Sequence, residues 1–157
     1  MKKSSHSLLI LGLSILMGQS VWAKDAQTKT SPQDTKAAAE FFRHELNFKT
    51  NPYGVNSALK DKQKNITIVD VRSATDFAKG HIPGAINLPW DKYNSFDGPD
   101  TTFPELRKDG YNYVYCYQLL CNLSQKAAVK FASLGYPVKE MVGGFAEWAK
   151  EKYPIEK

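Results

Sequence analysis

The chain has 157 residues, of which 42% are hydrophobic, and 21 Lys and Arg stand against 16 Asp and Glu for a formal net charge of +5. This length and composition fit one globular domain with one modest core and leave no room for a second. The positive excess is small and scattered, and the nearest approach to a basic patch, between Lys60 and Lys64, is interrupted by Asp61, so we expect no nucleic-acid partner.

The N-terminus has the three parts of a secretory signal in the order that a signal peptidase needs. Lys2 and Lys3 supply a basic start, residues 8–17 form an apolar run, and a small-residue ending closes at Ala23. The apolar run is about half of the roughly 20 residues needed to cross a bilayer, and no cysteine follows to accept a lipid. We therefore expect cleavage after Ala23, which removes the signal peptide of residues 1–23 and leaves a periplasmic or secreted protein without stable membrane insertion.

The first residues of the expected mature chain are polar. Residues 24–34 hold too little apolar surface to repay ordering, which indicates a flexible lead-in. From there we expect a single domain over residues 35–157. Apolar side chains recur with helical spacing over residues 35–46. Asn51 followed by Pro52 predicts the start of a second helix, because Asn caps a helix well and Pro fits its first turn.

The middle of the chain begins with a short, nearly all-apolar, β-branched run at residues 66–71. It predicts a strand buried on both faces of a parallel sheet, with Asp70 and Arg72 at its end. A short helix through Asp76, a turn at residues 80–84 and a brief strand at residues 85–88 are expected to follow. Residues 90–104, with Gly98 and Pro99 at their middle, are expected to form a long surface loop.

The last part of the chain predicts a strand at residues 111–115, directly before Cys116. Helical spacing over residues 123–134 predicts a helix that stops at Gly135. A short strand at residues 138–142, a glycine turn and a closing helix at residues 145–153 complete the pattern. Because strands alternate with helices, we expect an α/β fold, a three-layer sandwich with a central and mainly parallel sheet.

The two cysteines, Cys116 and Cys121, lie in one short segment and cannot clamp distant parts of the chain. A metal site is not expected, because the histidines left after signal cleavage, His44 and His81, lack the spacing of a ligand pair. Ligands bind at the carboxyl ends of parallel strands, where Cys116 is expected to lie. Backbone N–H groups and a helix N-terminus there would lower the pKa of a thiol and make it nucleophilic, the alternative being an inert buried cysteine.

A series of motifs over residues 66–148 resembles the rhodanese family in order and spacing. The motifs are Val69-Asp70-Val71-Arg72, Asp76-Phe77, Gly80-His81-Ile82-Pro83-Gly84-Ala85-Ile86-Asn87-Leu88-Pro89, Val114-Tyr115-Cys116, and Gly143-Gly144 with Trp148. The chain is most similar to a single-domain branch with a helical N-terminal extension and a Cys-x4-Cys-Asn loop. The resemblance implies a five-stranded parallel sheet between helices, in agreement with the alternation of strands and helices.

The resemblance also implies a chemistry. Cys116 would be the sulfur-carrying cysteine, whose thiolate takes sulfane sulfur from a small donor, becomes a persulfide and passes the sulfur to a thiol or protein acceptor. No organic cofactor or metal would be needed. Asp70 and Arg72 would be a structural ion pair at the end of the sheet, and His81 would brace its turn rather than act on the thiol.

The expected active-site loop departs from the common family pattern. It consists of Tyr117, Gln118, Leu119, Leu120, Cys121 and Asn122. It lacks the glycine that curls the backbone and the cation that binds an anionic donor, and it is about two residues longer. Thiosulfate is therefore not expected to be the preferred donor, and an apolar donor or a protein partner suits the loop better. The related phosphatases need an arginine where Asn122 stands, so a phosphatase is not expected.

Three classes of function follow from these residues. The first is a sulfurtransferase or persulfide carrier that uses Cys116. The second is a thiol-disulfide redox protein, because Cys116 and Cys121 are close enough in sequence to pair and Cys121 is a candidate resolving thiol. The third is a non-catalytic binding module that docks a partner through the apolar tip of Leu119 and Leu120. The position of Cys116 favours the first.

Overall fold

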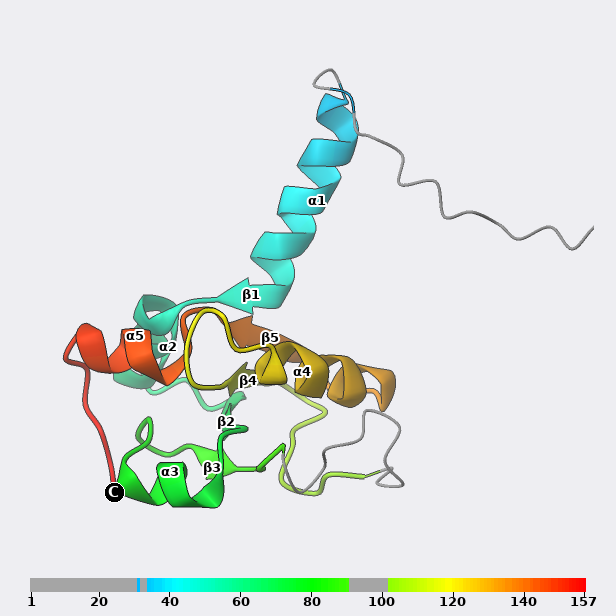
Figure 1. Cartoon of the computed structure of the whole chain (residues 1–157). Coiled ribbons are helices and arrows are strands. Elements are labelled where there is room, and N and C mark those ends of the chain that lie inside the picture. Colours follow the sequence, from blue (N-terminus) through cyan, green and yellow to red (C-terminus); the bar gives the residue numbers. More distant parts are fainter. Residues whose placement is uncertain (1–30, 32–33, 91–101) are drawn as a thin grey trace, which may run out of the picture. The chain divides into compact units, whose positions relative to one another are not determined.

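The computed structural model describes residues 31, 34–90 and 102–157 (Figure 1). The chain divides into a unit over Met1–Asp34 and a compact unit over Thr35–Lys157. The expected signal peptide, nearly all of the expected lead-in and the middle of the loop predicted at residues 90–104 lie outside the described residues. In the described part of the chain, no helix is long and apolar enough to cross a membrane.

Helices and strands alternate along the compact unit as the sequence predicts (Figure 1). In chain order the elements are α1 (Thr35–Phe48), β1 (Lys49–Thr50), α2 (Pro52–Lys60), β2 (Ile66–Asp70), α3 (Ala74–Lys79), β3 (Ile86–Asn87), β4 (Tyr111–Tyr115), α4 (Leu123–Ser133), β5 (Val138–Met141) and α5 (Gly144–Lys150). The side chain of Asn51 accepts a hydrogen bond from the Gly54 N–H and Pro52 opens the helix, as expected for the start of α2.

The strands form one five-stranded parallel sheet in the order β1-β5-β4-β2-β3. Strand β4 is the central strand, and it pairs with β2 over their whole length, with Ile66 opposite Tyr111 and Asp70 opposite Tyr115. The α/β fold with a parallel sheet is therefore confirmed. Strand β1 was not predicted, because it has only two residues and is recognisable solely by its pairing with β5.

Alternate side chains of the strands enter two separate cores, which gives three layers. On one face, Val69 and Val114 pack with Ala127 and Phe131 of α4. On the other face, Ile68 and Tyr115 pack with Val55 of α2 and Trp148 of α5. The sheet thus lies between α4 and the pair α2 and α5, and it is buried on both sides as the composition of β2 predicts.

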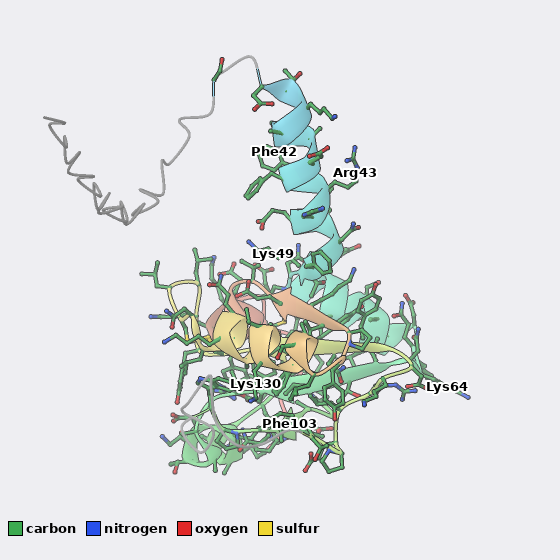
Figure 2. All side chains as sticks on the ribbon, turned by 90° about the vertical axis from the view of Figure 1, so that its right-hand side faces the viewer. Phe42, Arg43, Lys49, Lys64, Phe103 and Lys130 are labelled. Atoms are coloured by element: carbon green, nitrogen blue, oxygen red, sulfur yellow. A yellow bond between two sulfur atoms is a disulfide. The ribbon has the colours of Figure 1, made fainter. Side chains whose placement is uncertain are left out.

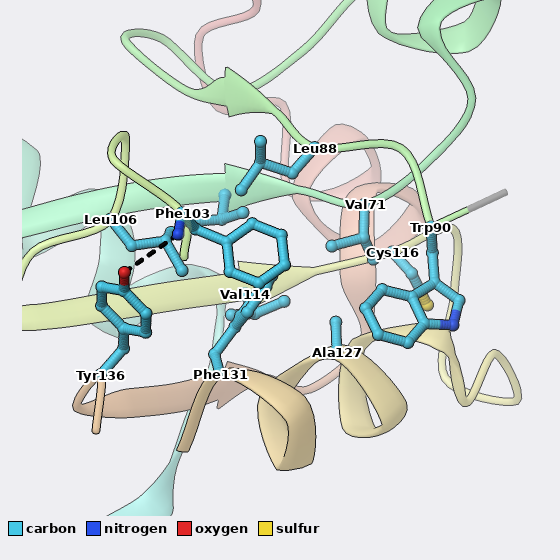
Figure 3. Packing of buried hydrophobic residues seen from close by; sticks show 11 residues of the cluster. Val71, Leu88, Trp90, Phe103, Leu106, Val114, Cys116, Ala127, Phe131 and Tyr136 are labelled. Atoms are coloured by element: carbon cyan, nitrogen blue, oxygen red, sulfur yellow. Dashed lines mark hydrogen bonds between the residues drawn. The ribbon is translucent and has the colours of Figure 1, made fainter. Parts of the chain in front are cut away.

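The segment predicted as a surface loop at residues 90–104 is buried at both of its ends. Trp90 and Phe103 are 4% and 2% exposed, and both rings pack edge-on against Phe131 (Figure 3). The Phe103 N–H also donates to the Tyr136 hydroxyl at 2.9 Å. The prediction of a surface loop is wrong for these ends. It follows from the turn-forming residues in the middle of the segment, whereas the aromatic residues near its ends belong to the core.

Helix α1 differs from the other long helices in having no buried side chain. Figure 2 shows Phe42 and Arg43 on different sides of this helix. Phe42 is 62% exposed and Leu46 is 78% exposed. The helical spacing of the sequence therefore predicts the helix correctly, but it does not bring an apolar face into the core.

Candidate active site

Cys116 follows directly after β4, at the carboxyl edge of the sheet. Its side chain is 1% exposed and belongs to the same core cluster as Trp90 and Ala127 (Figure 3). The loop that follows turns back, since the Cys121 N–H donates to the Gln118 carbonyl at 2.9 Å, and α4 begins at Leu123. The expected placement of Cys116 between a strand end and a helix start is thus the observed one.

Cys116 is bonded to Cys121 in a disulfide, with their Cα atoms 6.4 Å apart. This Cα separation lies within the range that a disulfide requires. The Cys121 carbonyl oxygen lies 3.2 Å from Cys116 Sγ, where it can accept a hydrogen bond from the thiol once the disulfide is reduced. The structure therefore represents the oxidised form of the loop, and Cys116 becomes a nucleophile only after reduction.

The N-terminus of α5 holds the start of the active-site loop. The Phe145 N–H donates to the Cys116 carbonyl at 2.8 Å, and the Ala146 N–H donates to the Tyr117 carbonyl at 2.9 Å. This close approach requires glycine at position 144, because a Cβ there would lie 2.5 Å from the Cys116 carbonyl oxygen and the backbone has a φ of +60°. The glycine pair of the sequence thus fixes the backbone that carries the candidate nucleophile.

Ser124, in the first turn of α4, connects Cys116 to a carboxylate. Ser124 is 2% exposed, and its Oγ lies 3.7 Å from Cys116 Sγ and 3.0 Å from Glu140 Oε1 on β5. The hydroxyl has one proton, so it donates either to the sulfur or to the carboxylate. Gln125 Nε2 donates to the other oxygen of Glu140 at 3.3 Å, which holds the carboxylate in place. A buried hydroxyl is therefore available to donate to a Cys116 thiolate.

Asp70 and Arg72 form a buried ion pair beside this loop. Arg72 Nη2 donates to Asp70 Oδ2 at 2.6 Å, and Nε lies 3.0 Å from both carboxylate oxygens. Arg72 Nη2 also donates to the Gly80 carbonyl at 2.8 Å, and its guanidinium lies 4.0 Å from the centre of the Phe145 ring. The guanidinium of Arg72 therefore contacts three elements around the loop, which are β2, the turn that follows α3, and α5.

Tyr115 and Tyr117 connect the same strand and loop to their neighbours. Burial, together with the Asp70 carboxylate, raises the pKa of Tyr115, whose hydroxyl accepts from the Ile82 N–H at 3.2 Å. The Tyr117 hydroxyl donates to Asp76 Oδ2 at 2.9 Å. Lys79, Ser73 and Tyr117 lower the pKa of Asp76 to about 2, so this carboxylate accepts the hydrogen bond at any ordinary pH.

The rest of the predicted loop faces solvent. Gln118 and Asn122 are exposed, and Leu119 and Leu120 are 68% and 88% exposed. A surface cavity of about 380 Å³ adjoins the loop at Tyr117. Its lining residues are Arg72, Asp76, Lys79, Gly80, Tyr117, Phe145, Ile155 and Lys157. The two exposed leucines therefore form an apolar tip beside the cysteines, whereas charged side chains of both signs line part of the neighbouring cavity.

His81 is occupied with α3 and the C-terminus. Its Nδ1 lies 3.0 Å from the Phe77 carbonyl oxygen, its ring stacks on Phe77 with centroids 3.7 Å apart, and its backbone bonds to that of Glu156. These contacts join His81 to α3 and to the C-terminal segment, and none of them is with Cys116. Among the described residues, no three His, Cys, Asp or Glu side chains gather as a metal site would require.

Sequence reasoning missed Ser124 and Glu140. The sequence places Ser124 in the helix predicted at residues 123–134 and Glu140 in the strand predicted at residues 138–142, and it does not indicate that the two side chains meet. The two side chains are 16 residues apart and meet because β5 lies next to β4 while α4 packs over both. A serine within the first turn after a strand-end cysteine is a usable signal, but nothing in the sequence points to its carboxylate partner.

Comparison with known proteins places this site in context. Residues 55–151 match the family model of the rhodanese-like domain. The thiosulfate sulfurtransferase GlpE of Pseudomonas putida is 36% identical over 99 residues, covering 60% of this chain and 79% of that protein. The adenylyltransferase and sulfurtransferase UBA4 of Candida albicans is 35% identical over 107 residues, covering 66% of this chain but only 24% of its own length.

A solved structure shows the same fold. The BH2092 protein of Bacillus halodurans superposes with a TM-score of 0.65 at 31% identity, over 78% of this chain and 86% of that one. The matched share includes more of this chain than the family model does. The solved structure therefore resembles this chain in both its fold and its sequence.

Proposed function

The chain belongs to the rhodanese-like domain family, and from this premise we propose that it moves sulfane sulfur from a donor to a nucleophilic acceptor through a persulfide on Cys116. Sulfur transfer in general is the activity named for its relatives GlpE and UBA4. The observation that carries the proposal for this chain is the position of Cys116, at the carboxyl end of the central strand β4 with the Ser124 hydroxyl at its sulfur.

The proposed reaction begins with the reduced loop. The Cys116 thiolate attacks the sulfane sulfur of the donor, the remainder of the donor leaves with the electron pair of the broken bond, and Cys116 becomes a persulfide. A thiol or protein acceptor then attacks the outer sulfur and releases the Cys116 thiolate. Ser124 acts as a positioning residue, because its hydroxyl can donate to the thiolate in both steps.

We further propose that the donor is apolar or presented by a protein. Arg72 is bound to Asp70 and Gly80, and Lys126 is exposed on α4. The most exposed large hydrophobic side chains of the loop are those of Leu119 and Leu120, and both are uncharged. Thiosulfate, a dianion, gains little from such surroundings, whereas an apolar group can pack on the two leucines.

The direct test is the intact mass of the reduced protein after incubation with a sulfane-sulfur donor. We expect the Cys121→Ser variant to gain one sulfur atom that a Cys116→Ser variant does not gain, while the wild type either keeps this sulfur or releases it as hydrosulfide. A gain of sulfur in the Cys116→Ser variant, or its absence from both the wild type and the Cys121→Ser variant together with no release of sulfide, would refute the assignment.

A second candidate function is favoured by the Cys116–Cys121 disulfide. We propose as the alternative that the chain exchanges electrons with other thiols through this pair. The alternative predicts that the reduced chain reduces a disulfide partner catalytically and that sulfur loading is absent. The Cys121→Ser variant separates the two functions in the mass experiment, because sulfur transfer loads a sulfur atom on its Cys116, whereas a dithiol redox protein that lacks its second thiol gains none.

We also propose that the protein acts after export. The basic, apolar and small-residue segments that end at Ala23 support this location. The N-terminal sequence of the protein purified from its producing cell should begin at Lys24. A mature protein that retains Met1 would overturn the proposal.

A further inference from the structure

We propose that Cys121 attacks the Cys116 persulfide at its inner sulfur, so that the chain releases the sulfane sulfur as hydrosulfide and ends as the Cys116–Cys121 disulfide. The inference rests on the proposed function, because it needs a persulfide on Cys116. It adds a different outcome for the bound sulfur, which is reduction to hydrosulfide instead of transfer to an acceptor.

The first support is the reach of Cys121. The sulfur atoms of the two cysteines are bonded to each other, so Cys121 Sγ reaches the inner sulfur of any persulfide carried by Cys116. The loop between them is anchored at both ends, by the hydrogen bonds from Phe145 and Ala146 and by the start of α4. The bond between the two sulfurs is therefore compatible with both anchors.

The second support is the burial of Cys116. Its side chain is 1% exposed, whereas the side chain of Cys121 is half-buried and is followed by the exposed Asn122. An external acceptor has to reach a sulfur at the bottom of the loop, while Cys121 is already there. A thiol tethered by a short flexible linker attacks with an effective concentration on the order of millimolar. Cys121 consequently competes with any acceptor present at micromolar concentration.

The step balances in atoms and electrons. The Cys121 thiolate supplies the electron pair of the new bond to Cys116 Sγ, and the bond between Sγ and the outer sulfur breaks. The outer sulfur leaves with that bond's electron pair as hydrosulfide, so it is reduced while the Cys121 sulfur is oxidised, and Cys116 Sγ exchanges one sulfur partner for another. Hydrosulfide is a better leaving group than an alkyl thiolate, because it is the weaker base.

A further turnover requires a reductant of the dithiol class. Such a dithiol reduces the Cys116–Cys121 bond by thiol–disulfide exchange and itself becomes a disulfide. The net reaction is then the reduction of sulfane sulfur to hydrosulfide at the expense of a dithiol. A reaction that supplies reduced dithiols in the same compartment must therefore accompany this activity.

The experiment uses a single turnover of the reduced, desalted full-length mature chain without added thiol. The donor probe is benzenethiosulfonate, whose apolar ring suits the leucine tip and whose leaving group, benzenesulfinate, is not a thiol. Free hydrosulfide is measured by bromobimane trapping and the protein by intact mass. The variants are Cys121→Ser and Cys121→Ala, with Ser133→Ala as the control, because Ser133 lies at the far end of α4, donates to the Lys130 carbonyl and leaves both cysteines and the loop unchanged.

We expect the wild type and the Ser133→Ala control to release one hydrosulfide per chain and to become lighter by two hydrogen atoms. Both Cys121 variants should instead retain one extra sulfur atom and release none. A wild type that keeps the persulfide, or Cys121 variants that release hydrosulfide as fast as the wild type, would overturn the inference while leaving the proposed function intact. If no protein gains sulfur or releases hydrosulfide, the proposed function fails and the inference fails with it.

Discussion

The buried hydroxyl of Ser124 offers the sharpest test of how the site activates Cys116. In the Ser124→Ala variant the thiolate loses a hydrogen-bond donor, and a hydrogen bond to a charged group contributes about 1.5 to 3 kcal/mol. The distance of 3.7 Å to Cys116 Sγ is long and Glu140 competes for the same proton at 3.0 Å. We therefore take the lower end of that range, about 1.5 kcal/mol, which corresponds to about one pH unit.

The matched variant is Glu140→Gln, for which the opposite effect is expected. Removing the carboxylate frees the Ser124 hydroxyl to donate to the sulfur and removes a negative charge near the thiolate. The pH midpoint of Cys116 alkylation should therefore fall in Glu140→Gln and rise by about one unit in Ser124→Ala. At a pH below the midpoint, the alkylation rate of Ser124→Ala should be about tenfold lower than that of the wild type.

The assay is the rate of iodoacetamide alkylation of Cys116 as a function of pH, in the reduced Cys121→Ser background so that a single thiol reacts. Ser133→Ala serves as a control, because Ser133 lies at the other end of α4 and donates to the Lys130 carbonyl. An unchanged midpoint in Ser124→Ala would refute the role of the hydroxyl. A higher midpoint in Glu140→Gln would show instead that the carboxylate assists removal of the thiol proton.

Three further predictions concern the loop. Replacing Leu120 by Arg should raise turnover of thiosulfate more than turnover of an uncharged persulfide, since one charge-assisted contact contributes about 1.5 to 3 kcal/mol; rapid use of thiosulfate by the wild type would contradict this. Mild peroxide should convert the wild type to the internal disulfide, reversibly by dithiol, whereas Cys121→Ser should accumulate oxygen adducts on Cys116 that dithiol does not remove; equal resistance of both in intact mass would remove the protective role of Cys121. Replacing Gly144 by Ala should lower the free energy of unfolding by more than the roughly 1–2 kcal/mol that a left-handed backbone costs a residue other than glycine, because the added Cβ would also meet the Cys116 carbonyl. Gly84→Ala is the control, since Gly84 has a φ of +71° and no atom lies within 4 Å of an added Cβ, so only the cost of the backbone conformation should be measured.

The sequence predicts the central part of the fold well and its margins poorly, for physical reasons. Strands β2 and β4 are buried on both faces, so their composition alone identifies them to within one residue. Strand β1 has only two residues, which are too few to show a pattern typical of a strand, and it is recognised only by its pairing with β5 in the folded sheet. The buried positions of Trp90 and Phe103 escape prediction likewise, because each depends on packing against Phe131 from a distant helix.

The same distinction applies to the candidate site. The position of Cys116 follows from local order, a strand and then a helix, and the glycine pair follows from a recognisable motif. The contact of Ser124 with Glu140 depends on β5 and α4 meeting in space, and the bond between Cys116 and Cys121 depends on the turn closed by Gln118. Sequence spacing permits these contacts and does not select them.

The disulfide and the persulfide are alternative uses of one sulfur atom, so the fate of Cys116 depends on which thiol reaches it first. Burial at 1% exposure slows every external thiol, while the hydrogen bonds from α5 hold the carbonyls of Cys116 and Tyr117 and Cys121 stays within bonding reach of Cys116. An acceptor can win only if it binds, and the exposed Leu119 and Leu120 are the surface on which an apolar acceptor or a protein would bind. The proposed transfer to a bound acceptor and the proposed release as hydrosulfide therefore start from one geometry, and we expect the occupancy of the leucine tip to decide between them.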